Sequence, residues 1–305
     1  MGKMVLAFNV VAMSLALAAM TACQTVKIDP IASDKIGIVL MHGKGGTTNH
    51  VDYLGSNLKS AGILVETPLM PWSKDRIYDK GYEESMEEID TYVARLKAAG
   101  ARRIFVAGHS LGANAALGYG ARREGLSGVI LLAYGHVPGV PGFARKLRES
   151  TEKARVMIAD GKGEEKSIFN DSGGGNDAAY STANDLFSWF DSEGPATIEN
   201  NAPKVNPNTP VLCVDGSNDP WQRCRQIMWQ VPKNPKNDTV VVNASHLGTP
   251  SSSVKVVADW IRALKCEKPW CGKPNPSIPV VEPKYLKGYG RLDCTLEQLI
   301  KSECE

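Results

Sequence analysis

One stretch of the chain, residues 102–117, restricts the possible folds more than any other. An apolar run over residues 104–107 leads directly into Gly-His-Ser-Leu-Gly at 108–112, and small residues follow. This order predicts a buried strand, an abrupt turn and a helix, and the turn fits the pattern Gly-x-Ser-x-Gly. Glycines suit such a turn because the two backbones approach too closely for a Cβ atom. We predict that Ser110 is a nucleophile at a helix N-terminus, where the helix dipole favours negative charge. The alternative is an ordinary strand-to-helix turn.

The N-terminus has the pattern of an export signal. A lysine precedes an apolar core, and small residues lead up to Cys23, which predicts a secretory signal peptide over residues 1–22. Residues 20–23, Met-Thr-Ala-Cys, resemble a bacterial lipobox. The resemblance implies that Cys23 is lipidated and anchors the mature protein to a membrane, with residues 23–34 as a tether. Gln24 in place of aspartate favours the outer membrane. We therefore expect an exported lipoprotein on the periplasmic side of the cell envelope. Cleavage without lipidation and an uncleaved anchor are the alternatives.

Composition narrows the class of partner. The 305 residues are 43% hydrophobic and 22% charged, as in an ordinary globular protein. The net charge is +2 and no basic patch stands out, so nucleic acid is not an expected partner.

The cysteines agree with export. Removing Cys23 from the seven cysteines leaves six, an even number that suits disulfides in an oxidising compartment. Sequence alone does not choose among the pairings, but short separations suggest Cys266–Cys271, Cys294–Cys304 and Cys213–Cys224. Cys213 lies in a predicted buried strand, so an inert thiol is the alternative there.

From residue 35 the chain alternates between apolar strands and helices. Several of the strands are apolar throughout, which is typical of strands buried on both faces of a parallel sheet. The predicted strands cover residues 35–41, 62–67, 102–107, 127–133, 210–215 and 238–242, and the predicted helices cover 52–61, 83–99, 113–123 and 253–264.

A glycine-rich loop, His-Gly-Lys-Gly-Gly at residues 42–46, follows the first predicted strand. An ordinary turn is one alternative, and the absence of the Walker spacing disfavours a phosphate loop. A loop of this type can supply a backbone N–H to the negative oxygen of a tetrahedral intermediate, together with the residue after the nucleophile. We therefore predict Leu111 and either Lys44 or Gly43 as oxyanion donors.

A serine nucleophile needs a base and an acid that orients the base. His246 follows the last predicted strand, and Asp219 follows the strand before it. The order Ser110, Asp219, His246 is that of the α/β hydrolases. Asp215 competes for the role of the acid, but it lies within the predicted strand, ahead of the glycine turn. We favour Asp219.

The chain over residues 35–264 resembles the α/β hydrolases, and within them the serine esterases and lipases. The resemblance implies an α/β fold with a mostly parallel sheet flanked by helices, although too few residues precede Lys35 for the usual first two antiparallel strands. It also implies acyl transfer without a metal or an organic cofactor. The motifs that carry the resemblance are residues 42–46, 108–112 and 216–219 and His246.

The expected activity is hydrolysis of a small-molecule carboxylic ester through an acyl-enzyme. An amidase, a peptidase, a thioesterase or an acyltransferase could use the same triad. A lipoprotein that keeps the fold as a binding module without catalysis is the third alternative.

An insertion over about residues 140–208 interrupts the alternation of strand and helix, where many α/β hydrolases carry a cap. A cap excludes water and shapes the substrate pocket. Within it we predict helices over residues 143–154 and 183–190 and a short strand over 155–158. The acidic loop 170–177 lacks the spacing of a calcium-binding loop.

Large side chains near the predicted strand ends are candidates for substrate binding. For the aromatic residues the alternative is loop packing, for Arg76 a surface ion pair, and for His136 ordinary hydrogen bonding. The candidates are Trp72, Arg76, Tyr78, His136, Trp189 and Phe190.

Beyond the domain, residues 265–305 are rich in proline and cysteine and form a predicted disulfide-containing C-terminal extension.

Overall fold

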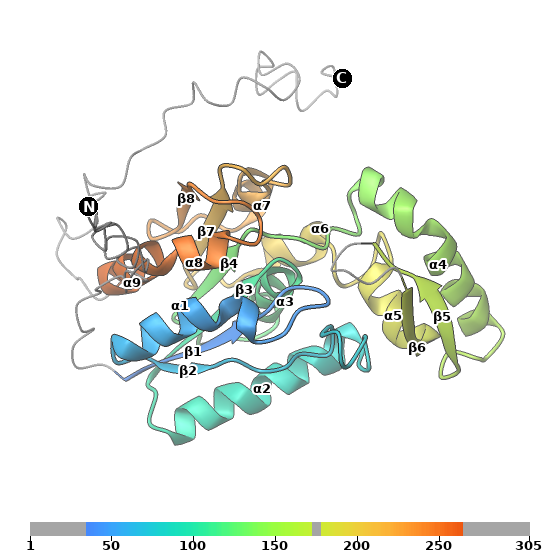
Figure 1. Cartoon of the computed structure of the whole chain (residues 1–305), viewed down its shortest axis with the longest axis horizontal. Coiled ribbons are helices and arrows are strands. Elements are labelled where there is room, and N and C mark those ends of the chain that lie inside the picture. Colours follow the sequence, from blue (N-terminus) through green and yellow to red (C-terminus); the bar gives the residue numbers. More distant parts are fainter. Residues whose placement is uncertain (1–34, 173–177, 265–305) are drawn as a thin grey trace, which may run out of the picture.

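The computed structural model describes residues 35–172 and 178–264. Its centre is a six-stranded sheet in the order β2-β1-β3-β4-β7-β8 (Figure 1). Every neighbouring pair in this sheet is parallel, and the described residues add no antiparallel strand to it. The strands are β1 (Ile36–Met41), β2 (Leu64–Glu66), β3 (Arg103–His109), β4 (Gly128–Leu132), β7 (Val211–Gly216) and β8 (Asp238–Val242).

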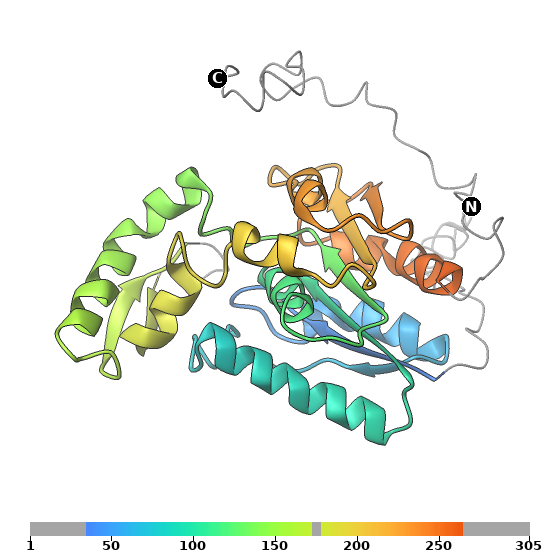
Figure 2. The same ribbon diagram turned by 180° about the vertical axis from the view of Figure 1, so that it is seen from behind.

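Helices cover both faces of the sheet. On one face, α1 (Asn49–Ser60), α8 (Thr249–Ser252) and α9 (Val254–Ala263) lie over the sheet; on the other lie α2 (Tyr82–Ala98) and α3 (Leu111–Gly120) (Figures 1 and 2). Side chains of β1 alternate between the two layers. Burial on both faces explains why the strands are apolar throughout, and it confirms the predicted α/β class.

An insertion separates β4 from β7, and its outer part lies beside the sheet (Figure 1). The predicted strand over residues 155–158 is wrong, because these residues belong to the last turns of α4. Met157 and Ile158 are half-buried against the core, whereas Val156 is 47% exposed, as one face of a helix requires. The elements are α4 (Pro141–Ala159), the antiparallel strands β5 (Lys166–Asn170) and β6 (Ala178–Thr182), α5 (Ala183–Phe190), α6 (Ile198–Asn201) and the 3₁₀ helix η1 (Ala202–Lys204).

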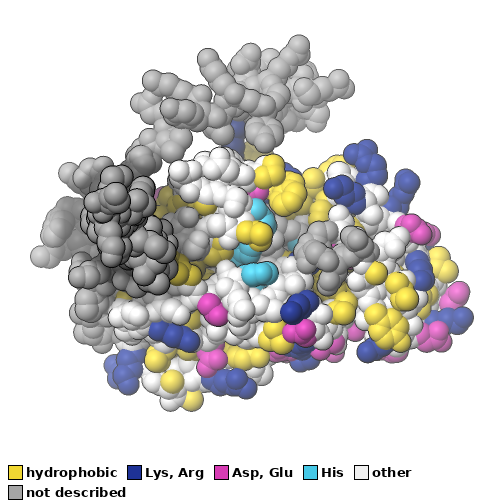
Figure 3. Space-filling model, viewed as in Figure 1, with side chains coloured by type: hydrophobic (Ala, Val, Ile, Leu, Met, Phe, Trp, Pro, Cys, Tyr) yellow, Lys and Arg dark blue, Asp and Glu magenta, His cyan; other side chains and the backbone are white. Residues whose placement is uncertain are grey.

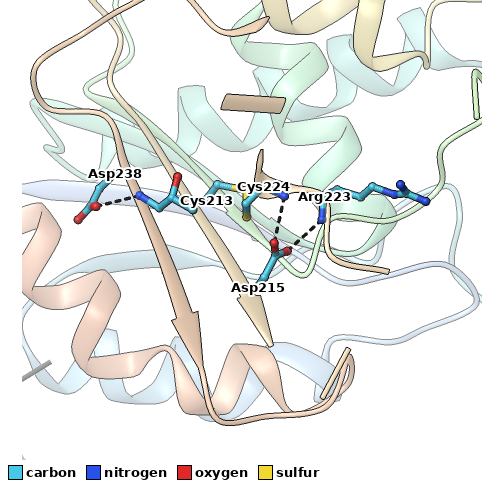
Figure 4. Close-up of a disulfide and its surroundings, with 6 residues drawn as sticks. Cys213, Asp215, Arg223, Cys224 and Asp238 are labelled. Carbon is cyan, nitrogen blue, oxygen red and sulfur yellow. Dashed lines mark hydrogen bonds between the residues drawn. A yellow bond between two sulfur atoms is a disulfide. The ribbon is translucent and has the colours of Figure 1, made fainter. Parts of the chain in front are cut away.

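A disulfide joins Cys213 on β7 to Cys224 at the start of α7 (Cys224–Gln230), with a Cα–Cα distance of 5.4 Å (Figure 4). This predicted pair is confirmed. It closes the segment over residues 214–223, which carries both candidate acids, so the covalent link restricts the motion of that segment.

Several predictions fall outside the described residues: the signal peptide, the lipidated Cys23, the tether, and the C-terminal extension with its two predicted disulfides. Within residues 35–172 and 178–264, no helix is long and apolar enough to cross a membrane.

Candidate active site

The turn between β3 and α3 holds Ser110 in a strained backbone conformation, with φ of 55° and ψ of −117°. Hydrogen bonds over-determine this geometry: the Ser110 N–H donates to the carbonyl of Leu132 at 3.0 Å. Close backbone contacts require glycine at positions 108 and 112. A Cβ atom on Gly108 would lie 2.1 Å from the backbone of Gly112, and one on Gly112 would lie 2.6 Å from the carbonyl oxygen of Met41. The sharp turn therefore depends on both positions.

Three side chains from three strand ends form one hydrogen-bond chain. The Ser110 hydroxyl lies 3.0 Å from His246 Nε2, and His246 Nδ1 lies 2.7 Å from Asp219 Oδ2. The Asp219 side chain is buried, and the Trp221 ring meets the His246 ring edge-on at 5.3 Å. With a proton on Nδ1 facing the carboxylate, Nε2 presents its lone pair to the serine hydroxyl.

A second histidine supports the backbone of His246. His109, beside Ser110, has its Nε2 3.0 Å from the carbonyl oxygen of His246. Burial lowers the pKa of His109 to about 3, so the ring is neutral and its Nε2–H donates to that oxygen. This bond ties the loop after β8 to the turn that carries the serine.

The two candidate acids have different partners. Burial by itself would raise the pKa of Asp219, but hydrogen bonds from His246 and from the Trp221 N–H outweigh it and hold that pKa below its ordinary value. Asp215 instead accepts backbone N–H groups from Arg223 at 3.3 Å and Cys224 at 3.1 Å (Figure 4). Asp215 therefore fixes the start of α7 and does not touch His246.

Asp215→Asn is expected to remove a loss of stability that the wild type suffers as pH rises. Burial raises the pKa of Asp215 from 3.8 to about 6. The stability contributed by the protonated carboxyl is therefore fully present below about pH 3.8 and is lost as pH rises through about 6. Because one pKa unit is about 1.4 kcal/mol, wild type should lose about 3 kcal/mol relative to the variant between about pH 4 and pH 8. Denaturant unfolding of both proteins across this range measures it, and a difference that does not change with pH would contradict it.

The loop after β1 lies against the serine. A Cβ atom on Gly43 would lie 3.1 Å from Ser110 Cβ, so the loop backbone and Ser110 are neighbours. The loop is held by His42, whose Nε2 accepts the Met70 N–H at 3.0 Å and whose carbonyl oxygen accepts Trp72 Nε1–H at 2.8 Å. The described residues supply no backbone acceptor for the N–H of Gly43 or of the predicted partner donor Leu111.

The Lys44 side chain joins this loop to the insertion. Its ammonium donates to Asp171 Oδ1 at 2.6 Å and to the Ser172 carbonyl oxygen at 3.1 Å, and both charged side chains are buried. Burial lowers the pKa of Lys44, and the Asp171 carboxylate partly offsets that effect. The ammonium also lies 5.2 Å from the centre of the Phe190 ring. Lys44 is thus paired internally, and its charge is neutralised.

A cavity of about 690 Å³ opens over Ser110 and His246. Figure 3 shows histidine side chains near the middle of this face, with hydrophobic side chains beside them. The walls come from the loop after β1, the loop after β4, the start of α4 and the loops that carry Asp219 and His246. A mostly apolar cavity with a few convergent polar groups is typical of a small-molecule site.

A model of the alpha/beta hydrolase family matches residues 38–260. The chain belongs to the alpha/beta hydrolase family. No curated protein matches its sequence. Similar solved structures include a metagenome-derived lipolytic enzyme of the pair LipS and LipT, with 14% identity, a TM-score of 0.54, and coverage of 76% of this chain and 95% of the other. A thermostable carboxyl esterase from Bacillus coagulans has 18% identity and a TM-score of 0.54, covering 78% and 91%. A monoacylglycerol lipase from Paleococcus ferrophilus has 19% identity and a TM-score of 0.53, covering 75% and 94%. At these identities the likeness is one of fold.

Six residues were predicted to contact substrate. Among the residues that the structure describes, His136 is the one of these six that lines the cavity. Its Nε2–H donates to the carbonyl oxygen of Trp189 at 2.8 Å. Burial, with Lys44 nearby, lowers the pKa of His136 well below its ordinary value, so the ring is neutral and Nδ1 is an acceptor. A role of His136 in substrate contact stays a prediction.

The four aromatic residues that were predicted to bind substrate pack against one another. None of them belongs to the cavity wall as the described residues form it. Trp72, Tyr78, Trp189 and Phe190 are each at most 2% exposed. The Trp72 and Trp189 rings meet at 5.3 Å, and the Tyr78 and Phe190 rings at 5.4 Å. Together they pack the loop after β2 against α5. This arrangement agrees with the alternative interpretation of these residues, packing of the loop.

Arg76 is engaged with acids of its own chain. Its guanidinium binds both carboxylate oxygens of Glu88, at 2.6 and 2.9 Å, and its Nε donates to Asp79 at 2.9 Å. Arg76 is absent from the cavity wall within the described ranges. The ion-pair alternative therefore describes Arg76.

The sequence reasoning did not single out several residues of the cavity wall. Trp221 had the clearest signal, because it stands two residues after Asp219. Residues on α4 had none, because only the fold brings that helix to the serine. These additional lining residues include His50, Phe143, Lys146, Trp221, Arg223 and Leu247. No cluster of three or more His, Cys, Asp or Glu side chains suited to a metal ion occurs over the described ranges.

Proposed function

We propose that this α/β hydrolase cleaves carboxylic esters through an acyl-enzyme intermediate. The observation that carries the proposal is the continuous hydrogen-bond chain from Ser110 through His246 to Asp219, at the floor of a largely apolar cavity. Family membership and the lipolytic and esterase relatives of the same fold support it.

In the proposed reaction, His246 Nε2 takes the proton of the Ser110 hydroxyl as Oγ attacks the ester carbonyl carbon. The resulting imidazolium is stabilised by Asp219 and returns the proton to the departing alcohol. Water then attacks the acyl-enzyme while His246 again acts as the base, and the carboxylic acid leaves. No other reactant is needed.

The negative oxygen of the intermediate would be held by backbone N–H groups. We assign these to Leu111, at the start of α3, and to Gly43 or Lys44 in the loop that touches Ser110. Such donors stabilise charge that develops only in the transition state, and each is worth roughly 10²–10³ in rate.

We further propose that the insertion over residues 140–208 acts as a cap on the domain formed by residues 35–264. Support comes from α4, which contributes Phe143 to the cavity wall, and from the buried Lys44–Asp171 pair that ties the insertion to the loop after β1.

For the cellular location, we propose an exported lipoprotein anchored through Cys23 on the periplasmic side of the envelope, with the outer membrane favoured. Its basis is the N-terminal sequence alone.

Labelling with a fluorophosphonate probe tests the proposal directly. The wild-type protein is expected to be labelled at Ser110, and Ser110→Ala should not be labelled. Ser172→Ala is the matched control, because Ser172 lines the same cavity but lies outside the triad. Equal labelling of the wild type and Ser110→Ala would refute the serine-hydrolase proposal. Esters of graded chain length, compared with the matching amides and thioesters, then separate the esterase from the amidase and thioesterase alternatives.

A further inference from the structure

The charged side chains around the cavity are unbalanced. Lys44, Lys146 and Arg223 line it, and no Asp or Glu does so among the described residues. Lys44 is neutralised by Asp171, so the excess positive charge comes from Lys146 and Arg223. A concave site lined by one sign of charge raises the local concentration of ligands of the opposite sign.

Arg223 is the more informative of the two because its guanidinium forms no ion pair or hydrogen bond with an acid in the described structure. Its Nε is buried and makes no hydrogen bond there. The charge of Asp215 interacts with that of Arg223, but the two Asp215 carboxylate oxygens accept the backbone N–H groups of Arg223 and Cys224. Figure 4 shows the Arg223 side chain extending away from that carboxylate. A buried donor without an acceptor is costly, which points to an acceptor supplied from outside the chain.

The backbone of Arg223 is well fixed for such a role. It is held by its own N–H bond to Asp215, and the next residue, Cys224, is bonded covalently to β7. Lys146 comes from α4, so the second positive charge belongs to the insertion. Its side chain is exposed, and it forms no ion pair with any described residue.

We infer that the substrate carries a carboxylate in addition to the ester that is cleaved, and that Arg223 binds this carboxylate with help from Lys146. A guanidinium suits the ligand because its fork of N–H donors matches the two oxygens of a carboxylate. The inference rests on the proposed ester hydrolysis. It makes Arg223 a specificity-determining residue, with no part in the bond-breaking steps.

Two matched pairs of esters test the inference and locate the carboxylate. Monophenyl adipate and phenyl methyl adipate differ only in an acyl-side carboxylate. The compound 4-acetoxyphenylacetate and its methyl ester differ only in an alcohol-side carboxylate, and the methylene group keeps the leaving groups similar. For the wild type we expect kcat/KM to be about tenfold or more higher for the anionic member of at least one pair, with the difference mainly in KM. Raising the ionic strength should reduce it.

Arg223→Gln should remove most of this preference while leaving kcat/KM for the neutral members within about twofold of wild type, because charge-assisted binding is lost without touching the triad. Lys146→Gln should reduce the preference by a smaller factor. Arg225→Gln is the matched control: Arg225 is an exposed residue of α7, and it lies outside the described cavity wall, so the preference should remain.

Equal use of the anionic and neutral members of both pairs by the wild type would overturn the inference and leave the proposed ester hydrolysis intact. An equal loss on both members in Arg223→Gln would also overturn it. If the wild type hydrolyses none of the four esters in a Ser110-dependent way, the proposed function itself fails, and the inference fails with it.

Discussion

Replacing Ser110 with alanine is expected to reduce kcat for ester hydrolysis by roughly 10⁶. The hydroxyl is the atom that would form the acyl-enzyme, and the described structure places no other hydroxyl in hydrogen-bond contact with His246. Oxyanion donors and the cavity would remain, so a residual activity roughly 10³–10⁴-fold above the uncatalysed rate is expected. Steady-state hydrolysis of an activated phenyl ester measures the effect, with the uncatalysed rate subtracted.

Loss of folding must be separated from loss of the hydroxyl in this experiment. The elbow is held by backbone contacts that alanine keeps, including the Ser110 N–H bond to Leu132 and the close approach of Gly108 to Gly112. We therefore expect thermal unfolding close to that of the wild type. Ser172→Ala should retain ester hydrolysis. Substantial activity in a folded Ser110→Ala protein would show that the reaction uses another nucleophile.

The main domain and the hydrogen-bonded arrangement of Ser110, His246 and Asp219 could be predicted from the sequence because local patterns and chain topology agree. Apolar strands alternating with helices require a parallel sheet, and a parallel sheet brings its strand ends to one edge. Ser110, Asp219 and His246 each follow a strand. The sheet topology therefore brings the three side chains together, and predicting this requires no exact distance between them. The choice of Asp219 over Asp215 followed the same logic, since Asp215 lies inside β7.

The insertion could not be predicted to the same depth, because its contacts are long-range. The hairpin of β5 and β6 buries few side chains, among them Phe169 and Ala179, and therefore shows little hydrophobic pattern. The pairing of Lys44 with Asp171 spans 127 residues of sequence and has no local signal.

Aromatic residues were the least informative signal for the cavity. An aromatic side chain in a loop looks the same in sequence whether it binds a substrate or packs against another ring. Trp72 and Trp189 pack together, whereas Trp221, which had not been singled out, lines the cavity beside His246. Only the three-dimensional arrangement separates these cases.

Asp219→Asn is expected to reduce kcat by about 10⁴ while leaving the fold intact. In the wild type the Asp219 carboxylate accepts a hydrogen bond from His246 Nδ1–H, with a Nδ1–Oδ2 distance of 2.7 Å, which leaves Nε2 free to accept from Ser110. An asparagine amide can present an N–H to Nδ1 and so favours the opposite tautomer, in which Nε2 carries the proton. The base would then face the serine with a donor, and it could not take the hydroxyl proton.

Asp215→Asn is the matched comparison, because it makes the same chemical change four residues earlier in the disulfide-closed segment. Its partners are the N–H groups of Arg223 and Cys224, so its effect on kcat should be under about tenfold and should come through the position of α7. Measuring kcat for both variants near pH 8, with unfolding curves for each, separates the two acids. A larger loss of kcat in folded Asp215→Asn than in Asp219→Asn would assign the orienting role to Asp215, and the hydrogen bond from His246 to Asp219 would then lie outside the reaction.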